Sequence, residues 1–322
     1  MKYATLLLIA GTAFAQPASI EFKSMCDASG AVWIDGKLLI VNDEDQNTTL
    51  LRLFDPNSGG KPVAAPVLPT SAIQFDSNEP EIDLEAITQI GATYWTIGSH
   101  SRNKSGVARW TRQNLIAFEW KSNAPVNMRS ITSLLPAIGI LARAADKNLK
   151  NIDPAVDPKD GGISIEGLAA TPEGDLLIGL RSPLDSQERA LIARLTKPSD
   201  AIKENRALPH LTKIHQLPLE GAGVRDLIHD APANRFLILS GPAGEGGPFR
   251  IWAWKGDQSA PTKLLDVTAL GKAGSPEAIV RTADKKAFWL IMDEGAAMRN
   301  GTACKDLRTE QQSFHAVRFQ LP

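Results

Sequence analysis

Four acidic residues occupy the same position in copies of a repeated strand pattern. Glu85, Glu166, Asp226 and Glu277 each open a short apolar strand, which a turn joins to a second, more hydrophobic strand. Carboxylate oxygens are the ligands that hard cations such as Ca²⁺ and Mg²⁺ prefer, and paired carboxyl groups can act as general acid and base. If the fold brings these four side chains together, they can form a cation site or an acid–base site.

The repeat itself predicts how the fold does so. A fifth copy, at the N-terminal end, has Ser29 as its opener, and the five first strands are expected at 29–32, 85–87, 166–169, 226–228 and 277–280. A repeat whose units each hold several short strands is typical of a β-propeller, where equivalent positions lie at one height around a central axis. We therefore predict an all-β fold, a five-bladed β-propeller with the acidic openers at one mouth of its channel.

The ends of the chain are expected to close the ring. The fifth repeat runs out of chain after its third strand, 314–319, and an unassigned strand at 18–22 can supply the missing fourth one, which hides exposed sheet edges. The fourth strands of the first and second blades are expected at 63–67 and 129–134. An Ala-rich segment near 138–159 predicts a short helical insertion, with a degenerate sixth blade as the alternative.

Further charged residues are expected at the same mouth. Strand direction alternates, so the start of a first strand and the end of a second strand lie on one face. Reading both positions around the ring adds a mixed set of acids, arginines and one histidine to the four openers. These residues are Asp27, Asp43, Asp83, His100, Arg102, Arg181, Arg225 and Asp293.

So many carboxylates in a small ring need compensating charge, because close like charges raise one another's pKa. Either protons or a cation must supply it, and an oxygen ligand set without Cys or a His pair favours Ca²⁺, or Mg²⁺, over Zn²⁺. We expect the four openers to hold Ca²⁺, Arg181 and Arg225 to hold an anionic group, and His100 to transfer a proton. The alternative is a wide, solvated channel in which the acids pair with the arginines and water.

Three functions fit this mouth. The leading hypothesis is metal-dependent hydrolysis of a small anionic ester such as a phosphoester. A non-catalytic propeller that binds a ligand or protein and holds a structural metal is the alternative. A carbohydrate-active enzyme would need two carboxyl groups roughly 5 Å or 6.5–9.5 Å apart, and no sequence feature selects such a pair. The chain has no Gly-x-Ser-x-Gly pentapeptide, which argues against a serine hydrolase.

Composition and the N-terminal segment limit the possible protein classes and cellular locations. With 322 residues, 43% of them hydrophobic, and a net charge of −1, the chain can bury a full core and lacks the basic face that nucleic-acid binding needs. Lys2, the apolar run 6–10 and the Ala13–Ala15 segment predict a signal peptide, residues 1–15, cleaved after Ala15 and too short to span a membrane. We expect residues 16–322 to form a single domain, monomeric and periplasmic or secreted.

Export changes the interpretation of the two cysteines. Cys26 precedes the first repeat and Cys304 follows the second strand of the last, so both are expected on the same face of neighbouring blades. A disulfide between them would staple ring closure and, in the chain-entropy model, stabilise the fold by roughly 4–5 kcal/mol. Two unpaired buried thiols are the alternative.

Several motifs together resemble a bacterial family named domain of unknown function 3616. They span nearly the whole expected mature chain and are segments 25–30, 41–44, 83–87, 97–103, 165–169, 179–184, 224–227, 240–244 and 276–279. The resemblance implies a propeller but no reaction. Looser likenesses are to phytase-related, esterase-like propellers, through the Glu-Gly-Leu-Ala element at Glu166, and to calcium-dependent apyrases, which are five-bladed with a central calcium.

Overall fold

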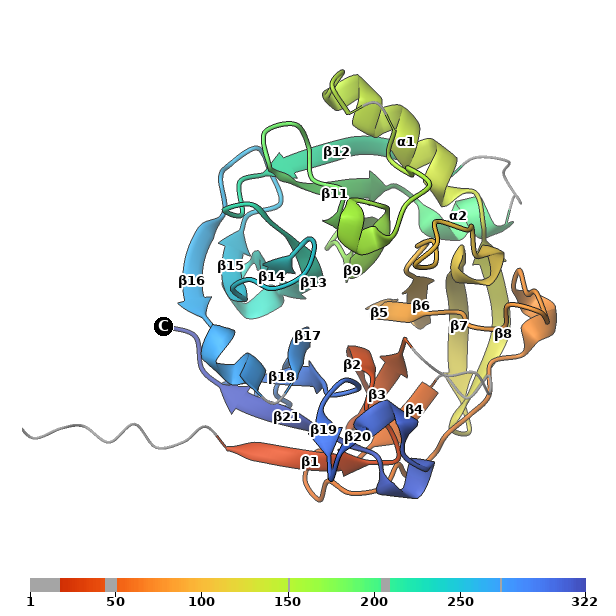
Figure 1. Cartoon of the computed structure of the whole chain (residues 1–322), viewed down its shortest axis with the longest axis vertical. Coiled ribbons are helices and arrows are strands. Elements are labelled where there is room, and N and C mark those ends of the chain that lie inside the picture. Colours follow the sequence, from red (N-terminus) through yellow and green to blue (C-terminus); the bar gives the residue numbers. More distant parts are fainter. Residues whose placement is uncertain (1–17, 44–50, 150, 204–208, 273) are drawn as a thin grey trace, which may run out of the picture.

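The computed structural model of the chain describes residues 18–43, 51–149, 151–203, 209–272 and 274–322. The predicted signal peptide lies outside these residues. Five antiparallel sheets stand around a central axis, each with its first strand innermost (Figure 1). The predicted five-bladed β-propeller is confirmed.

Each blade is a meander that runs outward from the axis. Blade 1 holds β2 (Ala28–Ile34), β3 (Lys37–Asn42) and β4 (Leu51–Phe54). Blade 2 holds β5 (Leu84–Ile90), β6 (Thr93–Gly98), β7 (Leu115–Lys121) and β8 (Ala124–Ile131). Blade 3 holds β9 (Ser164–Ala170), β10 (Leu176–Ser182), β11 (Ala190–Leu195) and β12 (Leu211–Leu217).

The last two blades follow the same order. Blade 4 holds β13 (Ala222–Asp230), β14 (Arg235–Pro242), β15 (Arg250–Trp254) and β16 (Thr262–Asp266). Blade 5 holds β17 (Ser275–Arg281), β18 (Phe288–Asp293), β21 (Ser313–Phe319) and, outermost, β1 (Ser19–Lys23). A small hairpin of β19 (Met298–Arg299) and β20 (Thr302–Ala303) lies between β18 and β21 in the chain.

The core lies between the blades. The second strands are apolar on both faces and almost completely buried, as expected of strands covered by a neighbouring sheet on each side. Trp95 of blade 2 belongs to one cluster with Ile178 of blade 3, and Leu177 of blade 3 to another with Trp254 of blade 4. Blade-to-blade packing therefore fixes the height of each inner strand at the axis.

The N-terminal strand closes the ring, as predicted. β1 pairs antiparallel with β21 from Ser19↔Val317 to Lys23↔Ser313, and Figure 1 shows the two strands side by side. Phe22, Phe54 and Phe314 form a buried three-ring cluster, with centroids 4.8, 5.2 and 5.5 Å apart. Because Phe54 comes from β4, this cluster joins blade 5 to blade 1.

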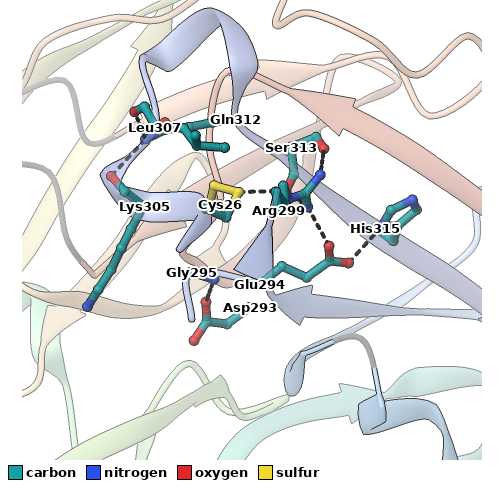
Figure 2. Close-up of a disulfide and its surroundings, with 11 residues drawn as sticks. Cys26, Asp293, Glu294, Gly295, Arg299, Lys305, Leu307, Gln312, Ser313 and His315 are labelled. Atoms are coloured by element: carbon teal, nitrogen blue, oxygen red, sulfur yellow. Dashed lines mark hydrogen bonds and ion pairs between the residues drawn. A yellow bond between two sulfur atoms is a disulfide. The ribbon is translucent and has the colours of Figure 1, made fainter. Parts of the chain in front are cut away.

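The predicted disulfide between Cys26 and Cys304 is also present. Cys26 precedes β2 and Cys304 begins a short 3₁₀ helix after β20; the Cα atoms lie 6.0 Å apart across 278 positions of sequence. The backbone N–H of Glu294 donates to the carbonyl of Cys26 at 2.9 Å. Figure 2 shows the bridge beside Glu294, whose carboxylate contacts Arg299 and His315 at 2.7 Å each.

Two outer strands differ from the prediction. In blade 1, the segment 63–67 makes a single bridge, between Leu53 and Ala64, because Pro62 and Pro66 have no N–H to extend a ladder. In blade 2, the outer strand is Ala124–Ile131 rather than 129–134. Ser122 and Asn123 both adopt positive φ, of 52° and 59°, and form the tight two-residue turn that starts this strand early.

The insertion is helical but begins earlier than expected. α1 (Leu134–Ala145) starts before residue 138, with Pro136 tolerated in its first turn. It buries Leu134, Ile138 and Ala142 at a spacing of four residues, in a cluster with blades 2 and 3. A second helix, α2 (Pro198–Lys203), follows β11. The described residues of this region form no sixth sheet, so the alternative of a sixth blade is wrong.

Within the part of the chain that the structure describes, no helix has both the length and the apolar character needed to cross a membrane.

Replacing Cys26 by Ser should lower the free energy of unfolding by about 4–5 kcal/mol, because the reduced unfolded chain loses a cross-link spanning most of its length. Denaturant titration of wild type and variant measures the difference. The single variants Cys26→Ser and Cys304→Ser should match the double variant, since each breaks the same bond. Equal stability of wild type and double variant would contradict a stabilising staple.

Candidate functional site: the charged mouth of the central channel

A β-bulge interrupts the inner strand of every blade near the mouth. The pairing of each first strand with its second strand skips one residue, and the extra residues are Ser29, Glu85, Glu166, Arg225 and Glu277. A bulge leaves its extra residue out of the ladder and re-aims its side chain. Four of these five side chains line the central cavities described below.

The bulges correct the sequence alignment of blade 4. The residue equivalent to Glu85, Glu166 and Glu277 is Arg225, not Asp226. Asp226 instead is equivalent to Gly30 and Gly167, which follow the bulged residue in blades 1 and 3. Both glycines pack closely against the next blade. A Cβ on Gly30 would come within 2.7 Å of Ala86, which shows how tight that layer is.

Asp226 accordingly contacts backbone, not the channel. Its carboxylate accepts from the N–H of Leu227 and from the N–H of Ile279 in blade 5, at 2.7 Å each. Burial raises its pKa to about 7, although both N–H donors act in the opposite direction. It is absent from the residues that line the described cavities, and its contacts join blade 4 to blade 5.

Arg225 lies between two of the glutamates. Its Nη1 donates to Glu277 Oε1 at 2.7 Å and lies 3.2 Å from Glu166 Oε2. Burial opposes its charge, but Glu166, Glu277 and Glu85 favour it, and the pKa of Arg225 is raised above its ordinary value. Its guanidinium also lies 5.7 Å from the ring centroid of Phe249.

Arg181 holds Glu166 from the other side. It is the extra residue of a second bulge, on β10, and its Nη1 donates to Glu166 Oε1 at 3.0 Å. Its Nε and Nη2 donate to the carbonyls of Pro242 and Gly244, at 3.1 Å each. Glu166 is thus held by two arginines, and Arg181 already donates from all three of its nitrogens.

Two other carboxyl groups have no such partner. Asp43 and Glu85 make no side-chain hydrogen bond or ion pair with the described residues, and Asp43 Oδ1 is buried. Burial, followed by repulsion from neighbouring acids, raises the pKa of both well above the ordinary range. Burial also raises the pKa of Glu277 to about 8, against the opposing effect of Arg225.

These groups line two adjoining cavities, of about 540 and 520 Å³. Asp43, Glu85, Lys159, Glu166 and Arg181 line both of them. The first cavity extends over blade 2, and its remaining charged residues are Glu81, Asp83, Arg102, Lys104, Arg109, Arg112 and Asp157. The second extends over blades 4 and 5, and its remaining charged residues are Arg225, Glu245, Glu277 and Asp293.

The acids predicted at the rim have varied partners. Asp83 accepts from Ser99 and Ser101 and lies 3.0 Å from Arg112 Nη1. Asp293 accepts from the N–H of Gly295 at 2.7 Å, and a Cβ on Gly295 would overlap the carboxylate of Asp27. Asp27, Asp293 and Gly295 therefore pack closely next to the disulfide.

The structure does not place His100 in the mouth. The residue is 1% exposed and does not line either cavity. Its Nδ1 lies 2.8 Å from the carbonyl of Gly98, a contact that requires the proton on Nδ1, and burial lowers its pKa to about 4. Arg102 does line the first cavity, but Asp153 binds its guanidinium at 2.6 and 2.8 Å.

Several basic residues of the mouth were missed by the sequence reasoning. Arg109, Arg112 and Lys104 lie in the connection from β6 to β7, and Lys159 precedes β9. The alternation of strand direction that placed second-strand ends at the mouth also places the loop after them there. Extending that argument by one loop indicates Lys104, Arg109 and Arg112, and applying it to the segment before a first strand indicates Lys159.

No group of three or more His, Cys, Asp or Glu side chains within the described ranges is arranged to hold a metal ion. Of the predicted ligands, Glu166 is engaged by arginines and Asp226 by backbone N–H groups. Asp43 and Glu85 remain as hard oxygen donors without a side-chain partner among the described residues.

Comparison with known proteins gives a family and distant structural likenesses, but no activity. No curated protein matches the sequence. Myxococcus xanthus glutaminyl cyclase is similar with a TM-score of 0.49 and 10% identity, over 96% of this chain and 97% of that one. A GH43 endo-arabinanase from Bacillus licheniformis is similar with a TM-score of 0.42 and 10% identity, over 94% and 96%.

A family model described as a protein of unknown function, DUF3616, matches residues 27–120 and 139–273. The matched segments include the inner strands of blades 1 to 4, the β6–β7 connection, and the strands β10 and β13 that carry Arg181 and Arg225. The chain belongs to the DUF3616 family.

Proposed function

We propose that the central mouth binds a small anionic ester, such as a phosphoester, and hydrolyses it with the help of a hard divalent cation of the Ca²⁺ type. The observation that carries this proposal is the pair Asp43 and Glu85, two carboxyl groups on the wall shared by both cavities with no partner among the described residues.

Charge balance supports a cation in the second cavity. Six carboxylates and three basic side chains line it, whereas the first cavity has six of each. Without a cation, protons must neutralise part of this excess, which agrees with the raised pKa values of Asp43, Glu85 and Glu277. A divalent ion would displace the protons of Asp43 and Glu85 once these two carboxyl groups rotate toward it.

Basic side chains of the first cavity support an anionic ligand. A phosphate or carboxylate group placed there meets Lys159 and the Arg112 guanidinium, whose Nε is buried without a hydrogen-bond partner. Glu277 takes over the role first predicted for His100, because a carboxyl group with a pKa of about 8 holds a proton at neutral pH and can protonate a leaving group. The bound cation would supply Lewis-acid stabilisation of the anion.

A second candidate function is a propeller that binds its ligand without turnover. The engagement of Arg181 by Glu166, Pro242 and Gly244 favours it, because that guanidinium is held as part of the scaffold. In that case the cation stabilises the mouth and no ester is cleaved.

We place either function in an oxidising compartment outside the cytoplasm, with the chain exported by its N-terminal segment. The Cys26–Cys304 bridge supports this placement, because structural disulfides persist in such compartments.

Adding Ca²⁺ to chelator-treated protein should raise its Tm, by a stabilisation of about 2.7 kcal/mol at a hundredfold excess over the Kd. The double variant Asp43→Asn, Glu85→Gln should lose the shift. Glu245→Gln, a matched control that removes an exposed carboxylate from the same cavity, should keep it. Thermal melting with Ca²⁺, Mg²⁺ or buffer measures each case.

Measurements of proton release and of ester cleavage distinguish the two candidate functions. Ca²⁺ binding should release protons at pH 7, seen as a dependence of the binding enthalpy on the buffer's ionisation enthalpy. Phosphoester cleavage that Glu277→Gln abolishes would support catalysis, and a Tm shift without cleavage would support the binding propeller. No shift with any ion would rule out the cation.

The metal-free protein should lose stability as pH rises from 5 to 9. Burial raises the folded-state pKa of Glu277 to about 8, so the stability it contributes is present below its ordinary pKa and is lost as pH rises through 8. Glu277→Gln should flatten this loss by up to about 1.4 kcal/mol per pH unit. Denaturant unfolding in chelator at several pH values tests it; an unchanged slope would contradict the assignment, and Glu245→Gln is the control.

A further inference from the structure

A third cavity, of about 440 Å³, lies beside the mouth between α1 and the connection from β6 to β7. α1 lies on the outside of the ring next to blade 3 (Figure 1). Its residues Leu135, Gly139 and Ile140 form one wall of the cavity, and Trp110 and Gln113 lie on the other. We call this space the side cavity.

Exposed apolar side chains gather around the side cavity. Trp110 and Ile140 line it with 54% of their surface exposed, and Val107, also 54% exposed, is next in the chain to the lining residue Ala108. Val156 joins them, because its backbone packs against Gly106. Of the seven exposed large hydrophobic side chains in the described ranges, these four therefore lie at or near the side cavity. Such a concentration of exposed apolar surface is typical of a binding surface.

The side cavity adjoins the mouth through one residue. Arg102 lines both the side cavity and the first cavity of the mouth, and Asp153, which binds its guanidinium at 2.6 and 2.8 Å, lines the side cavity. Arg143 lies on the α1 wall and makes no ion pair with the described residues. Because Asp153 balances Arg102, the side cavity combines an apolar interior with one unbalanced positive charge, that of Arg143.

We propose that the side cavity binds the apolar organic group, aromatic or branched alkyl, of an ester whose anionic head occupies the mouth. This inference rests on the proposed function and names its substrate class. A cavity of this size holds an aromatic ring, and Trp110 offers a flat face for one. Charge complementarity favours an anionic ligand over a cationic one, since Arg143 lines the side cavity without an ion pair to the described residues, whereas Asp153 balances the charge of Arg102.

The test compares two non-hydrolysable anions with the same head. Phenylphosphonate should bind wild type about tenfold more tightly than methylphosphonate, because only its ring reaches the side cavity and buries apolar surface there. Trp110→Ala and Ile140→Ser should each reduce that advantage several-fold and leave methylphosphonate binding unchanged. Met298→Ala, which removes an even more exposed hydrophobic side chain from the β19–β20 hairpin, should change neither.

Calorimetric titration separates failure of this inference from failure of the proposed function. Equal affinity for the two anions in wild type, or a phenyl advantage that survives both variants, would overturn the side cavity. If neither anion binds, the proposed head site fails, and 1-anilinonaphthalene-8-sulfonate becomes the probe. Its fluorescence enhancement should then fall in Trp110→Ala but not in Met298→Ala, and equal enhancement in all three proteins would overturn the inference.

Discussion

The mouth of this propeller depends on one guanidinium. Arg225 is 7% exposed and lies between Glu166 of blade 3 and Glu277 of blade 5, so its charge offsets carboxylates that the fold brings out of water. Removing one partner of such a buried group leaves an uncompensated charge, which typically costs 3–5 kcal/mol. Arg225 makes no ion pair with the two remaining acids, Asp43 and Glu85. Their charge must therefore be balanced by a proton or by a cation from solution.

The same arrangement explains what the sequence could and could not predict. The repeated apolar strands reveal the blades, and the leftover strand 18–22 reveals closure, because both follow from hydrophobic pattern and edge protection. The bulges do not show in that pattern. In blade 4 two polar residues, Arg225 and Asp226, stand side by side between Val224 and Leu227, and only the pairing register tells which one leaves the ladder.

Side-chain depth was likewise hidden from the sequence. His100 lies on the predicted face of the ring, yet the chain there takes a left-handed turn at φ 56° and the imidazole is buried. The basic residues of the β6–β7 connection were readable from strand alternation, but that connection has no hydrophobic repeat to align it with the other blades. The order of strands in the blades was therefore predictable from the sequence. For the site, the sequence predicted the correct end of the channel but not which side chains face it.

Ring closure by β1 has a consequence for how the chain folds. Among the described residues, β1 is the first strand and pairs with β21, the last, so these strand contacts have the largest sequence separation in the described fold. Loop-closure entropy opposes such long-range pairing, and folds rich in it form slowly. During synthesis, β1 stays without its partner until β21 has been made, so the seam between blades 5 and 1, with its cluster of Phe22, Phe54 and Phe314, assembles last.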